Sequence, residues 1–209
     1  MTDQIERRGV RSSRVLAAIR SVPRHFFVPE RLYARAYDDC PLPIGLGQTI
    51  SQPYIVALMT QLLGLEGNEK VLEVGTGSGY QAAVLARLAR EIHTVEYLPE
   101  LARMARRTLD LLEIGNVHVH VADGSLGYPS EAPYDAILIA AAAPRAPQCV
   151  LEQLCSGGRL VLPVGPPRAQ ILQRWERRGD NFEPEDILPV AFVPLRGKNG
   201  WQYMEWEED

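Results

Sequence analysis

The chain has 209 residues, of which 46% are hydrophobic and 23% charged, and its formal net charge is −4. This length and composition are typical of one α/β domain, and the thin spread of Lys and Arg argues against nucleic acid as a partner. Residues 1–14 are polar and no run is long enough to cross a bilayer, so we expect a cytoplasmic protein with no membrane partner. We also expect a monomer.

Residues 12–22 are predicted to form an amphipathic helix. Ser12 is typical of a helix start, and Pro23 is expected to end the helix. Its apolar residues recur at helical spacing, namely Val15, Leu16, Ala18, Ile19 and Val22. The connector that follows, residues 23–53, interleaves prolines and glycines with aromatic residues. It is too apolar for a disordered linker and too broken for long elements, so we expect an ordered cap over a site.

A second helix is predicted from Pro53 to Gly64, after which strands and helices alternate. We expect strands at 70–74, 92–96, 117–121, 135–140, 159–164 and 170–176, and helices at 79–89, 99–113 and 147–155. A late strand pair is expected at 188–195 and 201–206. This alternation predicts an α/β fold with a doubly wound, mostly parallel sheet.

The stretch 71–80 is the most informative feature, because an apolar strand runs into three alternating glycines, Gly75, Gly77 and Gly79. Glycine adopts positive φ and presents bare backbone, so such a turn can bring its amides close to a ligand. A dinucleotide fingerprint and a phosphate-binding P-loop starting at Gly75 would both need glycine where Tyr80 stands. The pattern E-x-G-x-G-x-G is similar to the first motif of class I S-adenosylmethionine (AdoMet) methyltransferases. The other interpretation is a strand-to-helix turn that binds nothing.

Three acidic residues lie where predicted strands end, which is where ligands bind in a doubly wound sheet. Glu96 comes about 20 residues after the glycines, from where a carboxylate can accept ribose hydroxyls. Asp123 could receive an adenine amino group, with Gly124 allowing the ring to approach, or the pair could be a plain turn. Glu73 either faces the amino group of the ligand or bonds the amides of the turn.

Cysteine and histidine spacing predicts neither a disulfide framework nor a metal site. The cysteines lack C-x-x-C spacing, and His118 and His120 share one strand face without further ligands. The segment 137–144 also lacks the Asn/Asp-Pro-Pro-Tyr motif of amino-group methylation, which disfavours adenine-N6 and glutamine-amide chemistry.

The segment 45–53 is a double-glycine turn that delivers small polar side chains to the start of the helix at Pro53. Ser51 has two interpretations here. A serine shortly before a proline is typical of a helix N-cap, and it is equally placed to serve a site.

Together these residues resemble one family, the protein-L-isoaspartate O-methyltransferases. The similarity runs nearly end to end, through 22–25, 27–29, 41–45, 47–53, 72–80, 134–137, 157–161 and 192–195. Two features depart from the family pattern. Ser125 stands where an aromatic residue is expected after Asp-Gly, which leaves the stacking of the adenine open, and the tail after Leu195 differs.

The resemblance implies methyl transfer from AdoMet to the α-carboxylate of L-isoaspartyl residues in damaged proteins and peptides, which starts repair through a succinimide. It implies that Ser51 is the active-site residue and that peptide substrate contacts Gln48, Thr49, Val193 and Leu195. The cofactor contacts it implies are Thr49, Ile50, Ser51, Gln52, Glu73, Gly75, Thr76, Gly77, Ser78, Gly79, Glu96, Asp123 and Gly124.

We expect one domain in three parts: a cap and substrate loop (1–53), an AdoMet-binding core (54–165), and C-terminal strands that contribute to substrate binding (166–209). The alternatives are a related methyltransferase for another carboxylate-bearing peptide or small molecule, and a non-catalytic AdoMet-binding module. The polar loop before the core argues against both. Asn199-Gly200 is expected as a hairpin turn that isomerises when mobile and then becomes a substrate of the enzyme itself.

Overall fold

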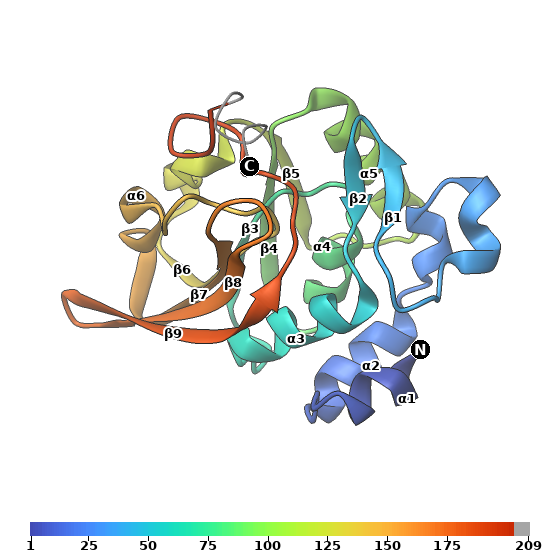
Figure 1. Ribbon diagram of the computed structural model, residues 1–209, viewed down its shortest axis with the longest axis horizontal. Helices are drawn as coiled ribbons and strands as arrows, with labels where there is room; N and C mark the ends of the chain where they lie inside the picture. The colour runs from blue at the N-terminus through green and yellow to red at the C-terminus, as the bar shows by residue number, and fades with distance from the viewer. Residues whose placement is uncertain (203–209) are drawn as a thin grey trace.

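The computed structural model describes residues 1–202, and its centre is a seven-stranded sheet in the order β5-β4-β3-β6-β7-β8-β9 (Figure 1). The strands are β3 (Lys70–Val74), β4 (Glu91–Glu96), β5 (Val117–Val121), β6 (Tyr134–Ile139), β7 (Leu154–Val164), β8 (Gln170–Arg178) and β9 (Asn181–Val190). The five strands from β3 to β7 run parallel, whereas β8 and β9 are antiparallel additions at one edge. The predicted doubly wound, mostly parallel sheet is confirmed.

The central strands form where the chain carries apolar runs, because both faces of a parallel sheet are covered. All but the first residue of β3 and of β4 are buried, as are most residues of β6. Helices α3 (Pro53–Leu63), α4 (Tyr80–Leu85) and α5 (Pro99–Leu111) share one apolar cluster with the strand face that carries Val71 and Leu138. The short α6 (Gln148–Leu151) shares a second cluster with the opposite face. Alternate strand residues therefore serve two cores.

The order in which strands are added to the sheet reverses at β3: β4 and β5 follow on one side of it, and β6 and β7 follow on the other. In open α/β sheets, ligands bind outside the carboxyl ends of the strands at such a switch point. The glycine turn follows β3, Glu96 ends β4, and Ala140 follows β6. The fold therefore brings these positions to one edge of the sheet.

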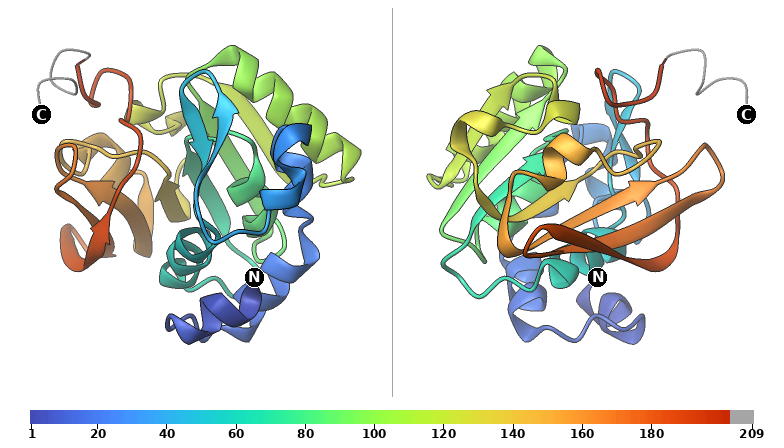
Figure 2. Two further views of the ribbon diagram at one scale, coloured as in Figure 1. Left: turned by 45° about the vertical axis from the view of Figure 1, so that its right-hand side comes forward. Right: turned by 90° about the vertical axis from the view of Figure 1, so that its left-hand side faces the viewer.

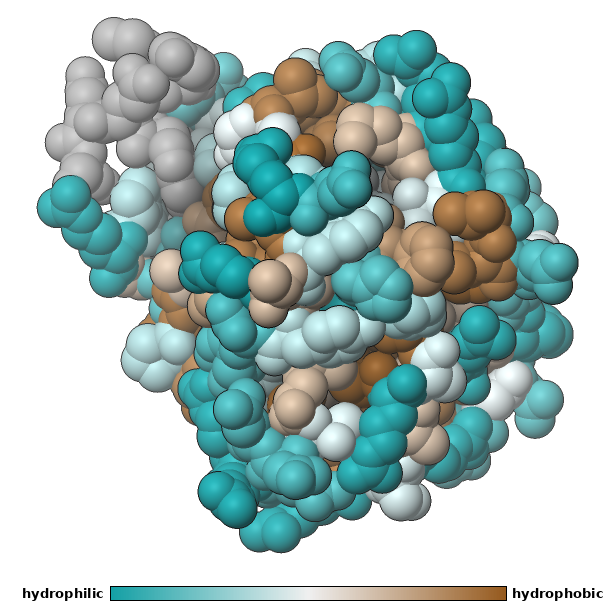
Figure 3. All heavy atoms as spheres, turned by 90° about the vertical axis from the view of Figure 1, so that its right-hand side faces the viewer, coloured by the Kyte–Doolittle hydropathy of each residue, from teal (hydrophilic) through white to brown (hydrophobic). Residues whose placement is uncertain are grey.

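The N-terminal part is an ordered cap, as expected. It consists of α1 (Thr2–Arg7), α2 (Ser13–Ser21), two short 3-10 helices, η1 (Arg24–Phe27) and η2 (Glu30–Arg35), and a hairpin of β1 (Leu42–Gly45) with β2 (Gln48–Ile50). The side chain of Ser12 accepts a hydrogen bond from Val15 N and so caps α2 as predicted. On the face that carries this cap, hydrophobic residues emerge in separate patches among hydrophilic ones (Figure 3). Figure 2 shows the hairpin and the segment after β9 rising past the same end of the sheet.

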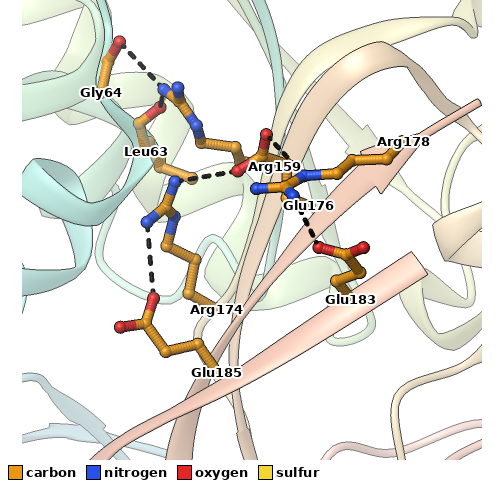
Figure 4. A network of polar contacts seen from close by, with 8 residues as sticks. All are labelled: Leu63, Gly64, Arg159, Arg174, Glu176, Arg178, Glu183 and Glu185. Carbon is orange, nitrogen blue, oxygen red and sulfur yellow. Dashed lines mark hydrogen bonds and ion pairs between the residues drawn. The ribbon is translucent and has the colours of Figure 1, made fainter. Parts of the chain in front are cut away.

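The outer strands carry charge in place of a continuous apolar face. Arg174 contacts Glu176 and Glu185, and Arg178 contacts Glu176 and Glu183, at 3.0 to 3.4 Å (Figure 4). Charged side chains on an edge strand disfavour pairing with a second chain. This edge of the sheet is thereby protected.

Two expectations about the chain were wrong in detail. The late strand pair is replaced by the hairpin of β8 with β9, which ends at Val190, and Trp201 and Gln202 are not in a strand. The rest of the expected strand, residues 203–206, lies outside the described residues. Two helices are also shorter than expected. The helix after the glycine turn, α4, ends at Leu85, and α6 ends at Leu151, because β7 already begins at Leu154. Within residues 1–202, no helix is both long and apolar enough to span a bilayer.

Candidate active site

The glycine turn after β3 has the backbone conformation that its sequence predicts. Gly75, Gly77 and Gly79 have φ values of 93°, 53° and 88°, a region that favours glycine. The turn is tied to the sheet, because Gly75 N donates to Val95 O at 2.8 Å. Gly79 then begins α4 as its N-cap residue. The alternating glycines are thus required by the backbone of the turn.

A cleft opens beside this turn at the carboxyl ends of the strands; we call it the main cleft. It encloses about 810 Å³ of space, its open mouth included. Its wall combines the β2 end and following loop (48–51), the glycine turn (75–78), the end of β4 (95–98) and the segment after β9 (193–196). Segments distant in the sequence therefore meet around one hollow.

Most of the predicted site residues line the main cleft. These are Gln48, Thr49, Ile50, Ser51, Gly75, Thr76, Gly77, Ser78, Glu96, Gly124, Val193 and Leu195. Four others, Gln52, Glu73, Gly79 and Asp123, lie nearby without forming part of its wall. The expected contacts of all these residues with cofactor or substrate stay predictions.

Glu96 forms part of the wall of the main cleft with its carboxylate already held by the backbone. Its two oxygens accept from Gly77 N at 2.8 Å and from Leu98 N at 2.9 Å, and the residue is 6% exposed. A carboxylate can accept about four hydrogen bonds, so two acceptor positions remain. The position fits the predicted role as acceptor for two ribose hydroxyls.

Glu73 lies behind the glycine turn and is fully buried. One oxygen accepts from Thr94 Oγ1, which is also bonded to Thr76 Oγ1 at 2.7 Å, and the other oxygen has no partner within residues 1–202. Burial raises the pKa of Glu73 to about 8, with the charge of Glu96 acting in the same direction and the Thr94 bond opposing it. In the structure, Glu73 thus bonds a threonine rather than the amides of the turn.

This raised pKa makes stability pH-dependent. A carboxyl whose pKa is higher in the folded than in the unfolded protein contributes stability that is fully present below the unfolded value of about 4.3 and is lost as pH rises through the folded value. We expect the free energy of unfolding to fall between pH 5 and pH 8.5, and Glu73→Gln to remove more than about 1 kcal/mol of that fall. Urea unfolding across this range measures it. Glu100→Gln, at an exposed position on α5, is the control, and an unchanged slope in Glu73→Gln would contradict the prediction.

The Asp123-Gly124 turn follows β5 and is fastened to the C-terminal segment. Asp123 accepts from Ser125 N and Ser125 Oγ, and from Lys198 N at 2.8 Å. A Cβ on Gly124 would lie 2.6 Å from Val74 Cγ1, so only glycine allows this close approach. Ser125, which stands where an aromatic residue was expected, accepts from Asn199 N at 2.9 Å. The carboxylate of Asp123 therefore holds its own turn and also the C-terminal segment that contains Lys198.

Ser51 does not cap the helix that follows it. The N-cap residue of α3 is Gln52, whose side chain makes no capping bond, and the amide of Tyr54 is satisfied instead by Asp39 Oδ1 at 3.0 Å. Among the described residues, the hydroxyl of Ser51 makes no hydrogen bond. Because Asp39 supplies the cap from another segment, the Ser51 side chain takes no part in capping α3.

A second hollow adjoins the first, and we call it the side groove. It encloses about 1030 Å³ and is lined by Arg8, Pro41, Thr49, Ser51, Gln52, Ile55, Ala140, Leu188, Pro189, Val190, Ala191, Phe192 and Val193. Thr49, Ser51, Ala140 and Val193 also line the main cleft. Ser51 therefore lies at the boundary between a cofactor-sized cleft and a largely apolar groove.

The chain matches a known family over residues 1–200. The matching family model is described as protein-L-isoaspartate(D-aspartate) O-methyltransferase. Relatives of that name from Syntrophotalea carbinolica and Syntrophobacter fumaroxidans are 53% and 55% identical, each over 95% of this chain and 92% and 93% of their own. The chain belongs to the protein-L-isoaspartate O-methyltransferase family. Its enzymes are AdoMet-dependent, so the methyltransferase takes AdoMet as cofactor.

Solved structures agree with this assignment. A protein-L-isoaspartate O-methyltransferase 28% identical to this chain superposes with a TM-score of 0.86 over 95% of it and 67% of its own length. A Plasmodium falciparum relative, solved with S-adenosyl-L-homocysteine, has a TM-score of 0.81 over 93% of this chain and 96% of its own, and at 23% identity it shows the shared fold.

The structure adds cleft residues of the methyltransferase that sequence reasoning missed. Tyr97 and Leu98 follow Glu96, Arg196 follows the Val-Pro-Leu segment, and Tyr80 and Gln81 begin α4. Tyr97 and Leu98 directly follow Glu96 at the end of β4, so the strand-end rule could have predicted them as well. For Gln81, inside an apolar helix, no local pattern existed.

The backbone of Val193 and Leu195 is largely occupied in the methyltransferase. Val193 O accepts from Ala142 N and Leu195 N donates to Ala142 O, both at 2.8 Å, and Leu195 O accepts from Trp201 N. Within residues 1–202, Val193 N is left without a backbone acceptor. If the peptide substrate contacts this segment, as expected, it is left with the Val193 amide and the side chains of Val193 and Leu195.

The Asn199-Gly200 pair lies in a turn, as expected, but neither residues 195–196 before it nor residues 201–202 after it are in a strand. Asn199 Nδ2 donates to Ser125 O and Cys149 Sγ, both at 3.2 Å, and Gly200 N donates to Gly197 O. Succinimide closure would need the Gly200 amide to leave this bond. Self-methylation at Asn199 stays a prediction for protein in which this segment has opened.

Proposed function

We propose that the main cleft holds AdoMet and that Ser51 orients the α-carboxylate of an L-isoaspartyl residue at the boundary with the side groove. The family makes this chain a carboxyl methyltransferase that acts on isoaspartyl residues of proteins and peptides. One observation carries the residue assignment: Ser51 lines both hollows, and its hydroxyl has no hydrogen-bond partner among the described residues.

The chemistry of the main cleft fits AdoMet better than a phosphate ligand. Its glycine turn offers bare backbone, Glu96 offers a carboxylate, and Val74, Val95 and Leu98 offer apolar wall. Neither lysine nor arginine lies in the turn 75–79, whereas a P-loop places a lysine on the phosphates. When bound, AdoMet supplies an electrophilic methyl group on a sulfonium. We infer that Gly75, Gly77, Glu96 and the residues around Gly124 hold it.

The acceptor needs no catalytic base, because a carboxylate is already ionised near neutral pH. The enzyme must bring a carboxylate oxygen in line with the methyl group, exclude water and orient the oxygen. A hydroxyl donor on a fixed backbone performs the last task, and Ser51, with Thr49 beside it, is placed for it. The methyl ester then closes to a succinimide as the neighbouring backbone nitrogen attacks the ester carbonyl and methanol leaves. Hydrolysis of the succinimide returns part of the material to normal aspartate.

The side groove suits the residues that flank the isoaspartyl group. Its wall combines Ile55, Leu188 and Phe192 with Thr49 and Gln52, and it continues into the main cleft. We infer a peptide lying along this groove, with Gln48, Thr49, Val193 and Leu195 beside the reacting residue. The charged β9 edge disfavours pairing with a second chain, which supports action as a monomer.

This assignment also gives the three parts of the chain separate roles, which are themselves proposals. Residues 1–53 carry the substrate loop and its cap, residues 54–165 hold the cofactor, and residues 166–209 complete the substrate side. The lining of the main cleft supports the role of the second part, because residues 54–165 supply most of its wall, with 48–51 and 193–196 completing it.

A matched pair of peptides tests the function. We expect labelled methyl transfer from AdoMet to a peptide with one L-isoaspartyl residue, and at least about 100-fold less to the same sequence with normal aspartate. In normal aspartate the α-carboxyl group is part of the peptide bond, and the free carboxylate is the side-chain one, which lies one bond further from the α-carbon. Methyl incorporation measured with each peptide in excess decides the matter. Equal transfer to both peptides would contradict isoaspartyl specificity, and AdoMet binding without transfer to either would contradict the activity.

A further inference from the structure

Arg24 is a fully buried arginine that the function described above does not use. It begins η1 and its side chain has no exposure to solvent. Charged residues are almost never fully buried unless paired with an opposite charge. Among residues 1–202, no carboxylate forms an ion pair with Arg24, and burial lowers the pKa of its guanidinium. The burial of Arg24 is therefore not explained by a counterion.

The guanidinium of Arg24 instead joins two separate backbone segments of the cap. Its Nε donates to Ala36 O and its Nη2 donates to Ser51 O, each at 2.8 Å. Ala36 directly follows η2, and Ser51 precedes α3. A planar guanidinium can hold two acceptors in one fixed geometry, which a single ammonium cannot. Arg24 therefore sets where the Ser51 peptide group lies relative to the cap.

The same side chain also borders the main cleft from behind. Its guanidinium lies 4.7 Å from the ring centroid of Tyr80, a residue of the cleft wall. On the other side, Gln52 Nε2 donates to Asp39 O at 2.8 Å. The loop that carries Ser51 is thus fixed through the Ser51 carbonyl and the Gln52 side chain, while the Ser51 hydroxyl makes no hydrogen bond within the described residues.

We propose that Arg24 is a positioning residue for methyl transfer, which holds the Ser51 carbonyl so that the Ser51 hydroxyl is directed at the acceptor carboxylate. This inference rests on the proposed role of Ser51. Arg24→Met leaves the Ala36 and Ser51 carbonyls without this donor, so we expect it to lower the free energy of unfolding. If fold stability were the only role of Arg24, the folded Arg24→Met protein would keep its turnover.

The test compares Arg24→Met with Arg159→Met. Arg159 is a matched control, because its guanidinium also donates to two backbone carbonyls, Leu63 O at 3.0 Å and Gly64 O at 3.5 Å, but at the far end of α3 (Figure 4). We expect Arg24→Met to lower kcat on an isoaspartyl peptide about 10- to 100-fold, with the Kd for AdoMet within about twofold. Arg159→Met is expected to leave kcat unchanged even where it lowers the melting temperature.

A double-mutant cycle separates positioning from a general loss of structure. If Arg24 acts through Ser51, Arg24→Met should change kcat by less than about threefold in a Ser51→Ala background, because the two changes remove one interaction. Arg24→Lys is the second variant should Arg24→Met not fold. Lysine keeps the charge but can hold only one of the two carbonyls that Arg24 holds. We therefore expect a kcat about tenfold lower, with the melting temperature near that of the wild type.

The outcomes separate this inference from the function on which it rests. Wild-type turnover in Arg24→Met or in a folded Arg24→Lys, with the Ser51→Ala defect present, overturns the role of Arg24 alone. Multiplicative defects in the double mutant overturn it as well. Wild-type turnover in Ser51→Ala overturns the role of Ser51 and with it that of Arg24.

Discussion

Replacing Ser51 with alanine is expected to lower kcat on an isoaspartyl peptide about 100-fold and to leave the Kd for AdoMet within about twofold. The reason is that the hydroxyl lies at the boundary of the two hollows and is bonded to none of the described residues, so its removal costs an orienting contact with the acceptor. Steady-state kinetics with saturating peptide and calorimetric titration with AdoMet give the two numbers. Ser51→Thr, which keeps the hydroxyl, should retain more of the activity than Ser51→Ala.

Ser12 provides the matched control for this substitution. Its side chain accepts from Val15 N and caps α2, whereas Ser51 caps nothing. We expect Ser12→Ala to cost about 1 kcal/mol of unfolding free energy with unchanged kcat, the reverse of the Ser51→Ala pattern. A Ser51→Ala protein that turns over normally, or that loses stability like Ser12→Ala while kcat holds, would show that the serine serves only the fold.

Glu96→Ala is expected to weaken AdoMet binding about 100-fold, which corresponds to about 2.7 kcal/mol. The carboxylate would lose both its bonds to the ribose and its hold on the glycine turn, because it accepts from Gly77 N and Leu98 N. Leaving those amides without a partner should also lower the free energy of unfolding by about 1–3 kcal/mol. Calorimetric titration with AdoMet and urea unfolding measure the two effects.

Glu91 is the control for Glu96, because it lies at the opposite end of the same strand. It contacts His93 at 3.2 Å and His118 at 3.4 Å, away from the main cleft. Glu91→Ala should therefore leave the Kd for AdoMet unchanged. Glu96→Gln, which keeps one oxygen acceptor, should fall between Glu96→Ala and the wild type. An AdoMet affinity in Glu96→Ala equal to that in Glu91→Ala would remove Glu96 from the cofactor site.

The core of the fold was predictable because local patterns agreed with the tertiary environment. Apolar runs predicted β3 and β5 at their observed bounds, and the three glycines predicted a turn whose positive φ values the structure shows. The C-terminal strands were predicted less well. β9 carries prolines and acidic residues at an exposed edge, so its pairing with β8 rather than its own pattern makes it a strand.

The site residues were also predicted only in part. The strand-end rule predicted Glu96, which lines the main cleft, and the same rule led us to expect Glu73 and Asp123 there. In the structure, the Glu73 carboxyl accepts a hydrogen bond from Thr94, and the Asp123 carboxylate accepts from Ser125 and Lys198. Which side of a corner a carboxylate faces depends on neighbours far along the chain, and spacing alone carries no such information.

The sequence by itself determined the parallel sheet, the glycine turn after β3 and the family, because each depends on residues close together in the chain. The tertiary structure decided that Ser51 is released from capping by Asp39, that Arg24 fixes its backbone, and that two hollows meet at its side chain. Those properties arise from contacts between segments 12 to 27 residues apart, and from strands brought together by the sheet. Only the folded chain places such groups within hydrogen-bond distance.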